Sequence, residues 1–294
     1  MLPFQIMPDT AKKASDTTKT DSTADEDVKH RKFQIGLEFA NDQSNHGLKN
    51  SSPLPYMEPS FTYTSKSGFY IEVEDQFLFV GKSVSKSRGG FDVFTANPGW
   101  DFDLSDNTSL DLNITYNYYK KKTPDLLKSG LFLVPEVYLD QYIIGELEGR
   151  VTIDYDMYKV TNPKQPKTPN DFVITPDLQY SFEWDFGKHK KNSFSFIPEV
   201  SVDFGTKNFI TVYQDNVISD TATNSKTNYN TSSSNSFGAL DCNVIVTLEL
   251  KLGKFKIEPI LNYVIPLYNE NNIVSSKPYG YGSLSLTYTL KSKK

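Results

Sequence analysis

Alternation of apolar and polar residues is clearest in two consecutive runs of the chain. From Phe172 to Phe186 the even positions are apolar or aromatic, and most odd positions are polar. After a basic turn the alternation resumes from Phe194 to Phe204. Side chains on a strand point alternately to opposite faces, so a period of two predicts strands with one apolar and one polar face. The first run is about fifteen residues long, whereas a typical globular strand has about five or six.

The same period recurs along most of the sequence and predicts about twelve strands in an all-β protein. The expected strands cover residues 33–39, 57–63, 69–76, 94–104, 110–118, 131–139, 151–157, 172–186, 194–204, 240–252, 255–265 and 284–290.

The connections between these strands alternate in length. Short turns are expected at residues 65–68, 105–108, 145–149, 187–192 and 253–254. Longer loops are expected at residues 41–55, 81–90, 120–130, 160–171, 205–236 and 268–278. An even number of strands, with short turns at one rim and long loops at the other, is the arrangement of an outer-membrane barrel, and it places both termini at the short-turn rim.

A soluble sandwich would show the same binary pattern with its apolar face turned inward. Three features favour the membrane. The strands are long and nearly uniform, as in tilted strands that cross a bilayer. The loop lengths alternate by side, and aromatic residues such as Trp100, Tyr118 and Trp184 concentrate toward strand ends, where interfacial girdles form.

In this architecture the chain resembles the bacterial outer-membrane β-barrel superfamily, most closely its twelve-stranded porin-like members. The final strand, from Tyr281 to Leu290, is similar to the C-terminal signal that barrel-insertion machinery recognises, although it ends in Leu290 and a basic tail instead of an aromatic residue. The resemblance implies an antiparallel up-and-down transmembrane barrel in the Gram-negative outer membrane, in contact with its lipid.

The chain is expected to consist of an N-terminal linker and a barrel domain. Residues 1–32 are polar and poor in large apolar side chains, which predicts a disordered periplasmic linker. Residues 33–290 are expected to form the barrel. The first seven residues are too short and interrupted for a signal peptide, which leaves a processed chain, a displaced start codon or a protein that is not exported. We expect one of the first two, because the strand pattern is strong.

One residue interrupts the pattern of the third expected strand. Asp75 would face lipid unless the ladder bulges there, and such a bulge would turn Leu78 and Val80 outward in place of Phe77 and Phe79.

Acidic residues dominate the polar face of the expected strands. The net charge is −5, from 36 acidic and 31 basic residues, which gives no support for nucleic-acid binding. Few basic residues lie on the same face of the expected strands as the acids; the main ones are Lys251 and Lys256. The expected lumen-lining residues are Glu38, Glu58, Glu72, Glu74, Asp101, Asp103, Asp111, Glu136, Asp154, Asp177, Glu183, Asp185, Glu199, Asp203, Asp241, Glu249 and Glu258. These carboxylates predict either a hydrated network without a substrate or a pore that favours cations, because carboxylate rings raise the local cation concentration.

No enzyme is predicted. The three histidines, His30, His46 and His189, fall in the linker, a loop and a turn, whereas outer-membrane hydrolases place a histidine on a strand face or at the rim. No metal-ligand spacing, phosphate loop or nucleophile motif is present, and no cofactor is expected. The function predicted is therefore passive diffusion of small neutral or cationic solutes. The alternative is a membrane-anchored scaffold that binds a protein partner through residues 205–236 and the N-terminal segment.

Overall fold

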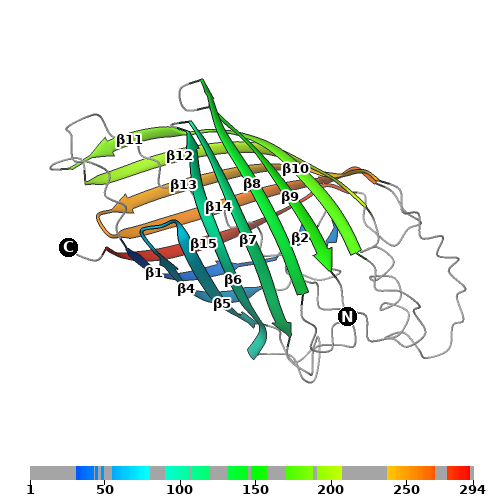
Figure 1. Ribbon diagram of the computed structural model, residues 1–294, viewed down its shortest axis with the longest axis horizontal. Helices are drawn as coiled ribbons and strands as arrows, with labels where there is room; N and C mark the ends of the chain where they lie inside the picture. The colour runs from blue at the N-terminus through cyan, green and yellow to red at the C-terminus, as the bar shows by residue number, and fades with distance from the viewer. Residues whose placement is uncertain are drawn as a thin grey trace, which may run out of the picture.

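The computed structural model describes residues 31–42, 44–45, 48–49, 55–79, 90–105, 107–119, 132–144, 147–157, 170–187, 191–206, 237–268 and 277–291. These residues form antiparallel strands, which Figure 1 labels along the chain. The strands are β1 (Lys32–Ala40), β2 (Ser44–Asn45), β3 (Leu48–Lys49), β4 (Tyr56–Thr64), β5 (Phe69–Leu78), β6 (Gly90–Ser105), β7 (Thr108–Tyr119), β8 (Phe132–Ile144), β9 (Leu147–Met157), β10 (Asn170–Tyr180), β11 (Phe182–Phe186), β12 (Asn192–Gly205), β13 (Gly238–Leu252), β14 (Phe255–Pro266) and β15 (Tyr279–Lys291). The described residues contain no helix long and apolar enough to cross a membrane.

Pairing between these strands closes the sheet into a ring. Strands that follow one another in the sequence pair from β4 to β10 and from β12 to β15. Strand β1 pairs with β4 on one side and with β15 on the other, so the first and last strands of the chain are neighbours. The ring closes where β10 pairs with β12. Since β10 and β11 are two parts of one interrupted strand, the main sheet of thirteen segments is a barrel with twelve strand positions. Figure 1 shows its two walls, with β7, β8 and β9 passing in front of β13, β14 and β15.

The exterior of the barrel is apolar and exposed. Outward-facing residues at mid-strand, such as Leu178 and Val200, are 47% and 48% exposed, whereas many polar residues of the opposite parity are buried. A water-soluble protein has the reverse arrangement. The apolar exterior is the surface expected against lipid, and it confirms the transmembrane barrel predicted from the alternation.

Aromatic pairs surround the barrel near the short-turn rim. Trp100 on β6 packs against Phe69 and Phe102, with ring centroids 5.8 and 5.9 Å apart, and Trp184 on β11 stacks on Phe194 at 5.7 Å. Such rings sit at the boundary between the hydrocarbon and the headgroups. The girdle predicted from the strand ends is therefore present at this rim.

The structure corrects the prediction in four places. The run from Phe172 to Phe186 is two strands, because Ser181 interrupts the ladder. Gly149 lies inside β9 and pairs with Gln141 and Leu178, so the turn expected at 145–149 is shorter.

The other two corrections lie near the long-loop rim. The irregularity near Asp75 falls between Gln76 and Phe77 in the pairing with β6, and Leu78 stays buried instead of turning outward. The loop at residues 41–55 contains the short hairpin β2–β3, which no alternation predicted. Residues 1–30 of the expected linker and most of the 205–236 loop lie outside the described residues, and Lys32, expected to end the linker, is the first residue of β1.

A charge placed on the exterior at mid-strand should destabilise the barrel. We expect Leu178→Arg to lower the free energy of unfolding by about 2–4 kcal/mol, because the charge would enter the hydrocarbon. Gln179→Arg is the matched control: this neighbouring side chain faces inward and donates to Glu148, so the added charge meets a carboxylate. Urea unfolding in bilayers measures both variants, and equal losses would contradict the assignment of the two faces.

Candidate functional site: the barrel interior

The interior of the barrel is lined by carboxylates, amides and hydroxyls from nearly every strand. Strand parity brings them there, because the residues opposite in phase to the lipid-facing positions point inward. On this inner face the described residues divide into an acidic wall on β1, β4 and β5, an amide wall on β5, β6 and β7, and an ion-paired wall on β9, β10 and β12.

The acidic wall carries Glu38, Glu58, Glu72 and Glu74. Glu38 lies directly opposite Glu58 in the pairing of β1 with β4. Tyr56 Oη donates to Glu38 Oε1 at 3.2 Å, and Thr62 Oγ1 donates to Glu72 Oε1 at 2.9 Å. Like charges directly opposite each other destabilise a sheet, so the pairing of Glu38 with Glu58 costs stability.

The amide wall continues the same interior surface. Tyr70 Oη donates to Asp111 Oδ1 at 2.7 Å, and Asn113 Nδ2 donates to the same oxygen at 3.1 Å. The Tyr70 ring lies against Gly99, where an added Cβ would come within 2.3 Å of the ring. Glycine at this position is therefore what allows the tyrosine to reach across β6 to the carboxylate.

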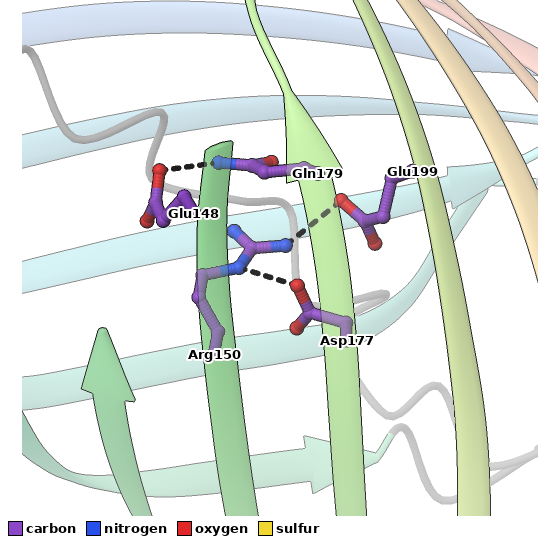
Figure 2. A network of polar contacts seen from close by, with 5 residues as sticks. All are labelled: Glu148, Arg150, Asp177, Gln179 and Glu199. Atoms are coloured by element: carbon purple, nitrogen blue, oxygen red, sulfur yellow. Dashed lines mark hydrogen bonds and ion pairs between the residues drawn. The ribbon is translucent and has the colours of Figure 1, made fainter. Parts of the chain in front are cut away.

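The ion-paired wall is organised by Arg150 on β9 (Figure 2). Its Nε donates to Asp177 Oδ1 and its Nη2 to Glu199 Oε2, each at 2.8 Å. All three side chains are largely buried, with 12%, 7% and 3% exposed. Asp177 is on β10 and Glu199 on β12, so one guanidinium links three strands across the pairing that closes the ring. Gln179 Nε2 extends the network by donating to Glu148 Oε2 at 2.7 Å.

The remaining predicted residues fall into four groups. Glu249 and Glu258 on the interior of β13 and β14 both contact the ammonium of Lys256. Four aspartates lie at inward positions of their strands but outside the networks described above: Asp101, Asp154, Asp203 and Asp241. Asp103 near the short-turn end of β6, and Glu183 and Asp185 on β11, are exposed. The side chain of Glu136 lies outside the described residues, although its backbone pairs with Asn113 and Asp154.

Sequence reasoning missed the residues that organise two of the walls. Arg150 has the same even parity as Thr152 and Asp154. Had the strand expected at 151–157 begun at residue 147, as β9 does, Arg150 would have been assigned to the inner face. The amide wall was overlooked because its residues are neutral. It could have been found from the parity of Asn97 and Asn113 with the neighbouring aspartates.

Within the described part of the chain, no three His, Cys, Asp or Glu side chains are placed to hold a metal ion. The acidic wall is thus an extended charged surface and not a compact metal centre.

The closed ring and its lipid-facing exterior decide the type of protein. It is an antiparallel β-barrel of the transmembrane type. Solved structures with a similar course of the chain include the NanC porin, at 8% identity and a TM-score of 0.46, covering 88% of this chain and 100% of that one. The KdgM porin shows 10% identity and 0.43, covering 87% and 98%. The COG4313 outer membrane channel from Pseudomonas putida F1 shows 10% identity and 0.43, covering 92% and 100%. No family model and no curated relative matches the sequence.

Removing the cation of the ion-paired wall should weaken the barrel. We expect Arg150→Gln to lower the free energy of unfolding by about 2 kcal/mol or more, because two buried carboxylates lose their charged donor. The triple variant Arg150→Gln, Asp177→Asn, Glu199→Gln should recover most of the loss, since no charge is left unpaired. Denaturant unfolding in micelles measures this, and an Arg150→Gln midpoint equal to that of the parent would show that the pairing contributes nothing.

Proposed function

We propose that the barrel is an outer-membrane channel through which small neutral or cationic solutes diffuse passively. The observation that carries the proposal is the acidic wall. Its register neighbours on β15 are Ser285, Thr287 and Thr289, and those on β6 are Val93, Thr95 and Asn97, all of them uncharged. Rings or walls of carboxylates raise the concentration of cations near them and repel anions.

Two of the inward-facing bases, Arg150 and Lys256, support the same preference. Arg150 is neutralised by Asp177 and Glu199, and Lys256 contacts two glutamates. A solute in the lumen therefore meets four glutamates grouped on one wall, and carboxylates paired with Arg150 or Lys256 elsewhere. Anionic solutes would find no comparable cationic surface among these groups.

Insertion of the barrel belongs to the same proposal. Strand β15 carries outward Leu284, Leu286 and Leu290 in regular alternation, and it pairs with β1 to join the two ends of the chain. We infer that this strand is the signal recognised by the barrel-insertion machinery. A protein partner at residues 205–236 remains the alternative function, and deletion of residues 216–233 with unchanged conductance but lost partner capture would favour it.

Ion selectivity tests the channel proposal. In planar bilayers with a KCl gradient, the purified barrel should give a reversal potential displaced toward that of K⁺. Neutralising the acidic wall with Glu38→Gln, Glu58→Gln, Glu72→Gln and Glu74→Gln should reduce the K⁺-to-Cl⁻ permeability ratio by about tenfold. Glu183→Gln, at an exposed position on β11, is the control and should change little. A barrel that does not conduct, or that prefers Cl⁻, would overturn the proposal.

A further inference from the structure

The carboxylates of the acidic wall form a ladder along the strands. Glu38 and Glu58 oppose each other on the first rung, Glu74 lies opposite Ser60 on the second, and Glu72 lies opposite Thr62 on the third. Successive rungs are two residues apart, which is about 7 Å along a strand. All four glutamates are partly exposed on the interior, so a solute can reach them.

Unpartnered polar atoms lie beside this ladder. Gln76 is 1% exposed, yet among the residues that the structure describes neither its Oε1 nor its Nε2 has a hydrogen-bond partner. It is the next inward residue after Glu74, and the pairing of Met57 with Phe77 places it next to Glu58 on the first rung. A buried amide with both ends unpaired is costly unless a ligand or water completes it.

The chemistry of the neighbouring unpartnered atoms indicates what the ligand donates. On the amide wall the unpartnered atoms are mostly oxygens, at Asn97 Oδ1, Asn113 Oδ1 and Thr115 Oγ1, with one nitrogen at Asn117 Nδ2. Asn97 pairs with Glu72 on the third rung. Carboxylates accept only, and most of these oxygens also require a donor. The surface therefore suits a cation rich in N–H donors.

Spacing distinguishes an organic cation from a metal ion. The described carboxylates do not converge into a group that could hold a metal, and rungs about 7 Å apart are too far for one coordination sphere. Linear aliphatic diamines and polyamines place ammonium groups a comparable distance apart on a flexible apolar stem, and each ammonium donates three hydrogen bonds, as lysine does.

We propose that the acidic wall binds a linear aliphatic diamine or polyamine, with successive ammonium groups on successive carboxylate rungs and the unpartnered oxygens of Gln76 and Asn97 beside them. This site rests on the proposed cation pathway and names the class of solute that occupies it. The opposed pair Glu38 and Glu58 would be relieved of its repulsion by the first ammonium.

Calorimetric titration of the full-length barrel in micelles tests the site without requiring conduction. The probes are 1,4-diaminobutane and, as the ligand control, 1-aminobutane. The diamine should bind at least about tenfold more tightly than the monoamine, because it engages two rungs at once. Glu74→Gln should weaken diamine binding by about tenfold, since a charge-assisted contact is lost while the side chain keeps its shape. Glu249→Gln, an inward acid on β13 that contacts Lys256, is the matched control and should leave the affinity unchanged.

Two results would overturn the site: equal affinities for diamine and monoamine, or an unchanged diamine affinity in Glu74→Gln. Bilayer recordings separate this failure from failure of the channel. Cation-selective current without diamine binding would refute the site alone, and diamine binding to a non-conducting barrel would support the site and refute the channel.

Discussion

The requirement that every backbone N–H and C=O be paired within the hydrocarbon governs this structure. An open sheet would leave two edges of unsatisfied groups in lipid, at several kcal/mol for each group. The chain meets the requirement by pairing β10 with β12. The pairing of β10 with β12 has a gap. Val173 and Ile174 have aligned partners on β12, and the next residue of β10 with an aligned partner is Asp177. Pro176, which has no N–H to donate, falls within the interruption.

Arg150 lies where this closure needs support. Its guanidinium bonds to Asp177 on β10 and to Glu199 on β12. A side chain thus adds a link between two strands whose backbone pairing has a gap next to it. A bidentate guanidinium suits this task because its planar donors reach two carboxylates at once. The same contacts remove the positive charge of Arg150 from the electrostatics of the lumen. One interior side chain thus links the two strands of the closing pair while its own charge is paired with their carboxylates.

Closure also creates the asymmetry of the interior. On the ion-paired wall Arg150 bonds to two carboxylates, whereas the wall on β1, β4 and β5 keeps glutamates from neighbouring strands facing one another. Adjacent amides such as Gln76 are buried without partners. Groups arranged in this way cost folding stability, and their retention is typical of a surface that binds something. A donor-rich cation would satisfy both the carboxylates and the unpartnered oxygens.

The sequence alone determined which face of each strand is apolar, because a period of two assigns every residue to one side or the other. The long strands and the outward positions of Leu178 and Val200 followed from it. The up-and-down order expected from the sequence implies which strands are neighbours, but the register of β1 with β15 and of β10 with β12 came only from the tertiary structure. The break at Ser181 was also invisible, because the apolar parity continues through it. Above all, parity could place Asp177 and Glu199 inside the barrel but could not show that Arg150 neutralises them while Glu38 faces Glu58. That difference depends on strand register, which is fixed only when the ring closes.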